Sequence, residues 1–434
     1  MSAPAGRRGA GKHVLVVNRW HDEFARYHEF IDHRRHRVAY LTTRAGARVL
    51  ASRLAEAVET VDDLGDRDAV AAAALALAIR HGRFDRVIAL SEYDLELGAH
   101  LRAVLGVPGP QPGETRLVRD KVAMKERVAR CGIRVPRFTG ATSAGAVRDF
   151  ARAVERPLIL KPRRSAASHG VIEVGSEAEL EAALARIPLD EYECEERIDG
   201  DVCQVDGVVA DGEVLALRAA RCINTDLEFA QGRRAGWVMN DDAELEGRLR
   251  AFTVRVLAAL AIRTSAFHLE VFKSPCEGAP GGYDLVFLEI GARMGGAQIP
   301  HMWRDLFGID LQDVWLRLQL DEPVLSPLRT SGAIGGFLLV PEPDAVPCRV
   351  VATTSLGDRV PELYAELLPA PGTVLDGDGG YDDIAGVFRF RGASTGQVEA
   401  AIRRVMREYA FEVEPVDAAA VAGRAGVAAA GGGP

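Results

Sequence analysis

The sequence predicts an α/β protein on three observations. Between residues 13 and 92, short runs rich in valine, isoleucine and leucine alternate with helix-like runs, a pattern typical of a parallel sheet covered by helices on both faces. Two strand-like runs, at 267–272 and 285–290, each carry one glutamate. Residues 331–415 combine strand-like runs with one helical run, which indicates a separate α+β unit. We therefore expect several domains.

Composition excludes several classes of protein. The chain has 434 residues and a formal net charge of −9, which argues against a nucleic-acid partner because such proteins present a basic face. Its six cysteines form no Cys-x-x-Cys pair, which argues against a zinc site and fits a reducing compartment. The most apolar run, residues 69–79, is too short to span a bilayer, and no secretory signal is evident. We expect a cytoplasmic protein with no membrane partner.

Residues 1–12 are small and basic and are predicted to form a disordered leader. The span from Gly6 to Lys12 matches the spacing of a phosphate-binding P-loop, but His13 stands where Ser or Thr is required. The span also precedes the first strand instead of following one. A P-loop is therefore not expected.

The first predicted domain follows this leader. We expect strands at 13–18, 36–43 and 84–92, and helices near 24–31, 44–57 and 69–81. Ser91 and Glu92 follow the last of these strands, where sites in parallel sheets lie. Ser91 is equally suited to cap a helix that reaches Leu105.

A Pro/Gly-rich linker at 106–114 marks the next boundary. The helix predicted after it carries Lys121 and Lys125 one turn apart, and lysines in such positions are usually only solvated. Lys161 closes the apolar strand 157–162, and the small residues of 163–170 follow before a strand at 171–174. A loop of this kind can lie over phosphates, although Gly170 is its only glycine.

The central region contains a clear hairpin signal. Asp211-Gly212 separates two strand-like runs, which is a typical two-residue turn. Residues 223–240 are expected to be irregular and able to line a pocket. A helix is expected at about 242–261, before the first glutamate-bearing run.

The two glutamates, Glu270 and Glu289, lie in runs joined by a Gly/Pro-rich turn, so an antiparallel hairpin would bring them together. Paired carboxylates suit Mg²⁺ held with substrate phosphates, and Arg293 nearby could neutralise a transferring phosphoryl group. The alternative is a solvent-facing strand with two ordinary acids, and spacing alone does not decide between them.

The C-terminal part begins after a helical segment that reaches residue 320. We expect strands at 332–340, 348–354 and 385–394 and a helix at 395–409. The acidic turn at 376–383 has Gly380 where a calcium loop needs Asp or Asn, so it is predicted to be a plain turn. Residues 416–434 are Ala/Gly-rich and are predicted to be a disordered tail.

In this order, several segments resemble the ATP-grasp superfamily of carboxylate–amine ligases. They are RDKVAMK at 119–125, LILKP at 158–162, SHGV at 168–171, EERIDGD at 195–201, FHLEVF at 267–272 and FLEIGARMGG at 287–296. The resemblance extends from about His13 to Pro415 and is greatest to the L-amino-acid ligase and carnosine-synthase-like branch.

The resemblance implies an ATP-grasp architecture. Its parts would be an N-terminal Rossmann-like domain (13–113), a lid-bearing subdomain (114–197), a metal-binding catalytic subdomain (198–330), a C-terminal α+β domain (331–415) and a disordered tail (416–434). It also implies a homodimer.

The resemblance further implies roles for individual residues. ATP would be bound by Lys121, Lys161, Ser168, His169, Gly170, Glu195, Glu196, Arg197 and Ile198. Mg²⁺ or Mn²⁺ would be held by Glu270 and Glu289, Arg293 would be catalytic, and His268, Gly295 and Gly296 would border the substrates. Three departures from the family pattern are the glycine-poor loop, Asp201 as the nearest candidate for a ribose contact, and Gly291 where biotin carboxylase relatives have Asn.

The implied activity is ATP-dependent formation of an amide bond between amino acids through an acyl phosphate, releasing ADP and phosphate. Two alternatives stay open: the same chemistry on a carrier-protein-bound or peptide-bound amine, and a regulatory module that binds ATP without catalysis. The sequence does not identify the carboxylate and amine substrates.

Overall fold

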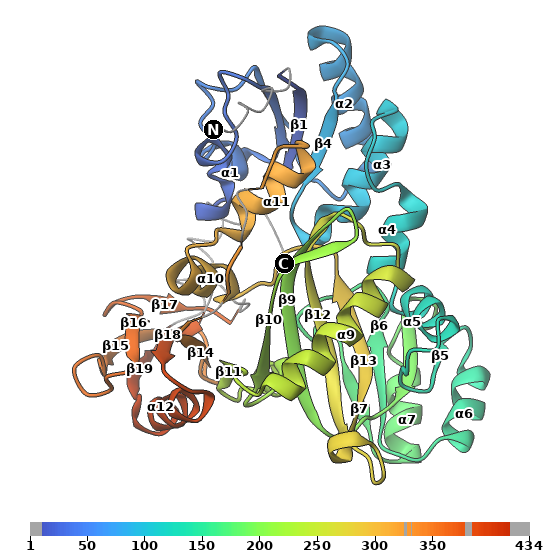
Figure 1. The fold of residues 1–434 in the computed structure, drawn as a ribbon, viewed down its shortest axis with the longest axis vertical. Coiled ribbons are helices and arrows are strands. Elements are labelled where there is room, and N and C mark those ends of the chain that lie inside the picture. Colours follow the sequence, from blue (N-terminus) through green and yellow to red (C-terminus); the bar gives the residue numbers. More distant parts are fainter. Residues whose placement is uncertain (1–10, 325–327, 331, 378–383, 417–434) are drawn as a thin grey trace, which may run out of the picture. The chain divides into compact units, whose positions relative to one another are not determined.

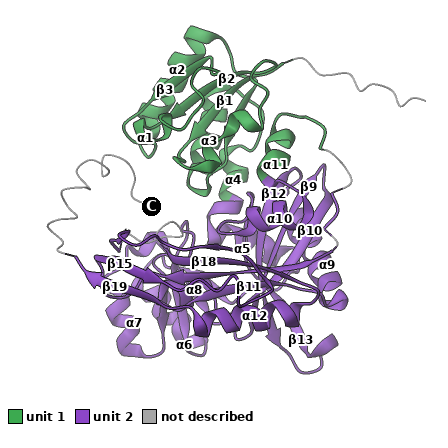
Figure 2. Ribbon diagram, turned by 90° about the vertical axis from the view of Figure 1, so that its left-hand side faces the viewer, with its two compact units in different colours: residues 1–116, 312–324, 431–433 green, residues 117–311, 325–430, 434 purple. Residues whose placement is uncertain are grey.

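The computed structural model describes residues 11–324, 328–330, 332–377 and 384–416. Most of the expected leader, the acidic turn around Gly380 and nearly all of the expected tail lie outside the described residues. The described chain forms two compact units (Figure 2). Of the described residues, unit 1 contains those up to 116 together with 312–324, and unit 2 contains 117–311 and those from 328 to 416.

Unit 1 is built on a parallel sheet in the order β3-β2-β1-β4 (Figure 1). The strands are β1 (His13–Asn18), β2 (Arg37–Thr42), β3 (Ala57–Thr60) and β4 (Arg86–Ala89). Every residue of β1 is buried, as expected of a parallel strand enclosed by helices. The main helices of unit 1 are α2 (Arg67–His81) and α3 (Leu95–Leu105). Ser91 caps the short 3₁₀ turn η3 (Glu92–Asp94) that leads into α3.

The predictions of two helices in unit 1 are wrong. Residues 24–31 form only the 3₁₀ turns η1 (Glu23–Ala25) and η2 (Tyr27–Glu29), and the buried Tyr27 packs between other aromatic rings. The helix expected at 44–57 ends as α1 (Arg44–Ala47). The chain then forms β3, which pairs with β2. Tertiary pairing thus overrides the helix-favouring composition of this segment.

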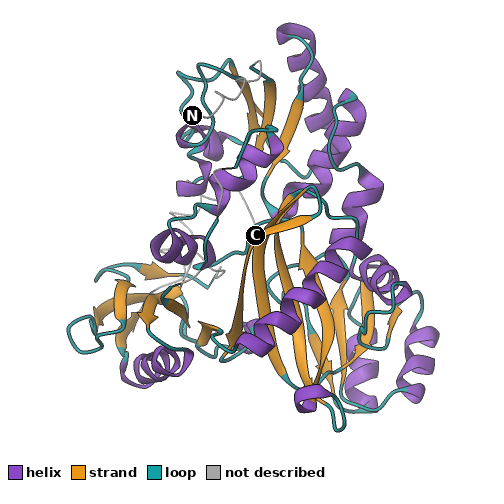
Figure 3. Ribbon diagram, in the orientation of Figure 1, coloured by secondary structure: helices purple, strands orange, loops and turns teal. Residues whose placement is uncertain are grey.

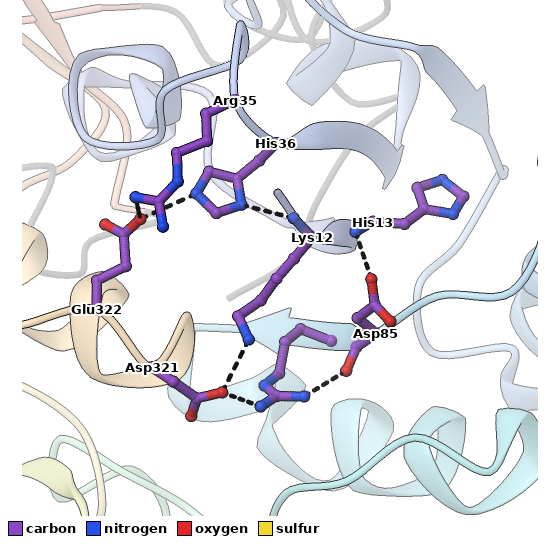
Figure 4. A network of polar contacts seen from close by, with 8 residues as sticks. Lys12, His13, Arg35, His36, Asp85, Asp321 and Glu322 are labelled. Carbon is purple, nitrogen blue, oxygen red and sulfur yellow. Dashed lines mark hydrogen bonds and ion pairs between the residues drawn. The ribbon is translucent and has the colours of Figure 1, made fainter. Parts of the chain in front are cut away.

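Residues 312–324, here called the return segment, contain most of α11 (Leu311–Gln319) and belong to unit 1. The sequence division had placed them in the 198–330 subdomain. Ion pairs and hydrogen bonds join the return segment to the N-terminal part of unit 1 (Figure 4). Asp321 pairs with Lys12 at 2.9 Å and with Arg86, and Glu322 pairs with Arg35 and with His36.

The first sheet of unit 2 is antiparallel, in the order β5-β8-β6-β7. Its strands are β5 (Phe138–Gly140), β6 (Leu158–Pro162), β7 (Ile172–Val174) and β8 (Tyr192–Glu196). Buried apolar residues of α6 (Ala144–Ala153) and α7 (Glu177–Leu184) pack against one face of this sheet. A 3₁₀ turn, η4 (Leu189–Glu191), precedes β8.

The helix expected before this sheet is divided in two. It consists of α4 (Pro112–Arg119) and α5 (Lys121–Arg130). Between them Asp120 has an extended backbone, with φ −93° and ψ 105°, and its side chain caps α5 by accepting from the backbone N–H groups of Val122 and Ala123.

The second sheet of unit 2 has eight antiparallel strands in the order β13-β12-β9-β10-β11-β14-β18-β16. Figure 3 draws the strands in orange. They are β9 (Asp201–Ala210), β10 (Glu213–Cys222), β11 (Ala235–Met239), β12 (Ser265–Pro275), β13 (Tyr283–Gly291), β14 (Ile334–Pro341), β16 (Leu363–Leu367) and β18 (Ile384–Gly392). The Asp211-Gly212 turn between β9 and β10 is confirmed, with φ of 52° and 88°.

One face of this sheet packs on α9 (Ala243–Ala259), which crosses it in Figure 1. Leu269 and Val271 point into that core. Because side chains alternate along a strand, His268 and Glu270 point to the opposite face. The helix α8 (Asp226–Ala230), the helix α10 (Ile299–Phe307) and the 3₁₀ turn η5 (Pro280–Gly282) complete this part of the unit.

The C-terminal strands continue the eight-stranded sheet, whereas the sequence predicts a separate α+β unit. β14 pairs with β11, with Ala235 opposite Leu339, and β18 pairs with β14. The helix α12 (Thr395–Glu408) packs on β14 and β18. A further sheet of β17 (Val374–Leu375), β15 (Cys348–Thr353) and β19 (Phe411–Pro415) follows. The expected domain boundaries stay predictions.

Among the described residues, no helix combines the length and the apolar character needed to cross a membrane.

Candidate functional site

A cavity of about 500 Å³ lies between the two sheets of unit 2. One side is formed by β6, β8 and the loop after β6, and the other by β9, β10, α8, β12 and β13. Of the predicted site residues, the following line it: Lys121, Lys161, Ser168, Glu195, Glu196, Arg197, Ile198, Glu270 and Glu289. His169, Gly170, His268, Arg293, Gly295 and Gly296 are not among its lining residues.

The two predicted acids meet at one end of this cavity. Glu270 and Glu289 are directly opposite each other in the antiparallel pairing of β12 with β13, so the predicted hairpin and its register are confirmed. Gln204 donates from Nε2 to Glu270 Oε1 at 3.3 Å, and Lys121 Nζ lies 3.2 Å from Glu289 Oε2. Both side chains face the cavity.

The donor set at this end suits a hard divalent cation. Carboxylate oxygens are the protein ligands that Mg²⁺ prefers, and it commonly takes one or two of them together with substrate phosphates. The described part of the chain has no group of three or more His, Cys, Asp or Glu side chains arranged to hold a metal. The pair Glu270 and Glu289 therefore fits Mg²⁺ only together with ligand oxygens.

Two lysines face the same cavity. Lys121 Nζ donates to Ser165 O at 2.7 Å, which links α5 to the loop after β6. Lys161 Nζ lies 2.6 Å from Glu195 Oε1. Burial would lower the pKa of Lys161, but the charges of Glu195, Glu193 and Glu289 raise it above its usual range. Lys161 is therefore fully charged at neutral pH.

Two of the buried groups beside these lysines, Lys125 and Glu193, are not among the site residues predicted from the sequence. Both are fully buried, and they are paired at 2.6 Å. Lys125 also pairs with Glu195. Burial would raise the pKa of Glu195, but the charges of Lys125 and Lys161 bring it below its usual value. The four-residue spacing of Lys121 and Lys125, and the two-residue spacing of the glutamates, were the available signals.

The loop at 163–170 is tied to the junction of α4 and α5. Arg163 donates to both oxygens of Asp120, at 3.1 and 2.6 Å. Ala167 and Ser168 have φ of 53° and 55°, and Gly170 has φ of 73°. Left-handed backbone is costly for residues other than glycine, so this loop stores strain beside the cavity.

Apolar side chains line the cavity beside the segment 195–198. They come from strands of both sheets and from the segments that flank them: Ile159, Val171, Ile198, Val202, Phe272 and Leu288. Asp201, the expected ribose contact, is not among the lining residues, whereas its neighbours Asp199 and Gly200 are.

His268 lies beside the acidic pair but outside the lining of the cavity. Its Nδ1 is 2.8 Å from Asp206 Oδ1 and its Nε2 is 3.4 Å from Glu270 Oε1. Burial would lower the pKa of His268, but Asp206 and Glu270 raise it to about 10. Gly295 packs against the same group, since an added Cβ would lie 2.3 Å from Asp206 Oδ1. At Gly296 an added Cβ would meet no atom within 4 Å.

Arg293 follows the end of β13. It donates from a terminal nitrogen to Met294 O at 2.9 Å, and its charge acts on His268. Arg293 is four residues beyond Glu289 in the chain and is not among the residues that line the cavity.

The segment expected to be irregular contributes another wall. Thr225, Asp226, Leu227, Glu228, Gln231 and Arg233 line the cavity, which confirms that residues 223–240 border a pocket. The prediction of irregular structure is wrong, because the segment contains α8 and β11. Thr225 and Glu228 form a capping box at the start of α8, and the Thr-x-x-Glu pattern was its signal in the sequence.

Comparison with known sequences gives two informative matches and no matching family model. The chain is 24% identical over 330 residues to the L-arginine-specific L-amino acid ligase of Bacillus subtilis, covering 71% of this chain and 73% of that protein. It is 36% identical over 122 residues to a D-alanine–D-alanine ligase of Marinobacter nauticus, covering 27% of this chain and 35% of that protein.

Comparison with solved structures shows the fold. An L-amino acid ligase from Bacillus licheniformis superposes with a TM-score of 0.74 at 18% identity, covering 94% of this chain and 100% of that chain. A biotin carboxylase from Campylobacter jejuni, solved as a β-γ-ATP complex, superposes with a TM-score of 0.63 at 15% identity, covering 93% and 92%.

Proposed function

We propose that this chain, which has the ATP-grasp fold and resembles two ligases in sequence, joins the carboxylate of one amino acid to the amine of another, converting ATP to ADP and phosphate. The curated relatives with ligase names support this substrate class. The observation that carries the proposal is the meeting of two cationic and two anionic side chains in one cavity: Lys121, Lys161, Glu270 and Glu289.

ATP would occupy the cavity of about 500 Å³ between the sheets, a volume typical of small-ligand sites. The apolar side chains of Ile159 and Leu288 would contact the base, with the backbone of 195–198 along its edge. Lys121 and Lys161 would bind the phosphates, and the loop 163–170 would lie over them. Excluding water matters here because an acyl phosphate hydrolyses readily.

Glu270 and Glu289 would hold Mg²⁺ or Mn²⁺ together with phosphate oxygens. When bound, the cation neutralises charge on the phosphates and orients them for transfer. Gln204 fixes the Glu270 carboxylate, and Lys121 fixes that of Glu289, so both ligands are positioned before the nucleotide arrives.

In the chemical step, the substrate carboxylate would take the γ-phosphoryl group to give an acyl phosphate. The amine would then attack the carbonyl and expel phosphate. Such transfer depends on positioning and charge neutralisation more than on covalent help. Arg293 would stabilise the charge that develops on the acyl phosphate and on the tetrahedral intermediate. The His268 imidazolium, held by Asp206, would add positive charge at the same end.

The proposal is tested by incubating the purified protein with ATP, Mg²⁺ and pooled L-amino acids, and by following ADP, AMP, phosphate and new amide masses. ADP and phosphate with a dipeptide mass is the expected result. AMP in place of ADP would contradict the acyl-phosphate route. ADP with no new mass would favour a carrier-bound or peptide-bound amine, and ATP binding without turnover would favour the non-catalytic module.

A further inference from the structure

The charges at the back of the cavity form a group of two cations and two anions, here called the buried quartet: Lys125, Lys161, Glu193 and Glu195. Lys161 and Glu195 line the cavity, whereas Lys125 and Glu193 do not. None of the four is more than 5% exposed. Water therefore solvates these charges very little, and each charged side chain relies on the oppositely charged members for compensation.

The geometry of the quartet follows from the strands. Lys161 on β6 is directly opposite Glu193 on β8, and Glu195 lies two residues further along β8, so these three side chains share one face of the sheet. Lys125 reaches this face from α5 and lies over the ring of Phe138, 5.2 Å from its centroid. Lys125 is thus fixed between the two carboxylates.

This arrangement creates a conflict for an anionic ligand. In the structure the Lys161 ammonium is 2.6 Å from Glu195, so a phosphate that binds Lys161 must compete with a carboxylate. The same carboxylate also repels the phosphate. A second cation paired with Glu195 removes both problems, and Lys125 is that cation.

We propose that Lys125 is a positioning residue that compensates Glu193 and Glu195, so that Lys161 is available to the nucleotide phosphates, and that Glu193 opposes this effect. The inference rests on the proposed binding of ATP in this cavity. Neither Lys125 nor Glu193 reaches the cavity, so both act through Lys161 and Glu195.

Two single variants of opposite charge test the proposal. Lys125→Met removes one buried positive charge, and Glu193→Gln removes one buried negative charge. At this depth a unit charge changes phosphate affinity on the order of tenfold or more. We expect Lys125→Met to weaken ATP binding by that factor and Glu193→Gln to strengthen it. The double variant, which restores neutrality, should bind ATP within about threefold of wild type.

Adenosine, which carries no phosphate, is the control ligand. Calorimetric titration of each variant with ATP and with adenosine distinguishes an effect of charge on phosphate binding from a change in the shape of the pocket. A change in charge alters the affinity for ATP and leaves that for adenosine unchanged, whereas a collapsed pocket weakens both. Opposite changes in ATP affinity for the two single variants, with the adenosine affinity unchanged in both, would support the proposal. Equal losses for both ligands, or no shift in either variant, would overturn it.

Lys125→Met leaves two carboxylates with one lysine and is the variant most at risk of misfolding. If it does not fold, Glu193→Gln and the double variant decide the matter. Glu193→Gln must bind ATP more tightly with adenosine unchanged, and the double variant must fold and return toward wild type. A Glu193→Gln variant that binds ATP equally or more weakly would overturn the proposal.

The outcome is distinguishable from failure of the proposed function. If the wild-type protein binds ATP and the two single variants shift the ATP affinity in opposite directions, but no amide product forms, the proposed ligase reaction is contradicted and the proposed role of Lys125 stands. If amide product forms but the variants show no opposite shifts in ATP affinity, the ligase reaction stands and the proposed role of Lys125 is contradicted. Wild-type protein that does not bind ATP would remove the premise of both.

Discussion

At the scale of single residues, Glu289 and Glu270 differ in their partners although they face each other. Lys121 contacts Glu289, while Gln204 and His268 contact Glu270. Glu289 therefore connects the acidic pair to Lys121, which we propose binds the phosphates. Glu289 is therefore the more informative of the two glutamates to substitute.

The substitution Glu289→Gln keeps the shape of the side chain and removes its charge. We expect ADP formation at fixed Mg²⁺ to fall on the order of a hundredfold, with partial recovery as Mg²⁺ is raised, because a weakened metal site is filled by mass action. ADP release measured across a Mg²⁺ titration checks this. The control is Asp284→Asn, a surface residue of β13 paired with Arg134. Unchanged ADP formation in Glu289→Gln would refute the metal assignment.

Asp120 makes a pH-dependent contribution to stability. Burial would raise the pKa of Asp120, but the hydrogen bonds and charge of Arg163 bring it below the ordinary value of 3.8. A group with a lowered pKa stabilises the fold above that value and loses this effect as the pH falls through its folded pKa. The contribution is therefore complete at neutral pH and declines below about pH 3.8.

The variant Asp120→Asn isolates this effect, because asparagine still caps α5 but no longer pairs with Arg163. We expect a loss of about 1–3 kcal/mol in the free energy of unfolding at pH 7, shrinking below pH 3.8. Urea unfolding at several pH values measures it. Asp149→Asn, at an exposed ion pair with Arg152, should cost little at any pH. A gap that stayed constant into acid would contradict the expectation.

Much of the acidic end could be predicted because its signal is local. Glu270 and Glu289 stand out as charges in apolar strands, and a hairpin fixes their register. Lys125 and Glu193 could not be singled out in this way. Their burial depends on β6, β8 and α5 meeting in space, and a lysine on a helix is usually solvated. His268 was selected, whereas its partner Asp206 lies 62 residues away in the chain and carries no local signal.

At the scale of elements, the loop 163–170 combines strain with a single glycine. Ala167→Gly should raise the free energy of unfolding by about 0.5–1 kcal/mol, because relief of left-handed strain exceeds the entropy that glycine adds to the unfolded chain. Thermal unfolding midpoints check this. The same substitution at Ala182, exposed within α7, should destabilise by about 0.5–1 kcal/mol. Destabilisation at both positions would show that Ala167 is not strained.

Gly170→Ala should act in the opposite direction within the same loop. An added Cβ would lie 2.8 Å from Pro162 Cγ and 2.9 Å from the Tyr192 hydroxyl, on a backbone with positive φ. We expect a loss of about 1–3 kcal/mol in the free energy of unfolding. A thermal midpoint equal to that of wild type would contradict the crowding at this position.

Long periodic elements were predictable and short strands were not. α2, α9 and the β12–β13 hairpin follow from periodicity over many residues. By contrast, β3 and β11 form because a neighbouring strand supplies their hydrogen bonds. The break at Asp120 was also missed, since the Asp120 side chain is paired with Arg163 from the loop after β6, which is distant in the sequence.

At the scale of the whole molecule, the return segment places a late part of the chain in unit 1. Glu322→Gln should lower the stability of unit 1 by about 1–3 kcal/mol, because Arg35 and His36 lose a partner that is only 11% exposed. Hydrogen exchange of the β1 and β2 amides would report it as faster exchange. Glu59→Gln, at the surface pair with Arg80, should have little effect. Faster exchange confined to unit 2 would contradict the assignment of this segment.

The return segment also has a consequence for synthesis on the ribosome. The first part of unit 1 ends at residue 116, and its ion-pairing partners Asp321 and Glu322 are made about two hundred residues later. At about 5–20 residues per second, the delay is on the order of ten to forty seconds. During that interval the nascent parallel sheet has Lys12, Arg35 and His36 without these carboxylates. Unit 1 therefore reaches its final form only after most of unit 2 has been translated.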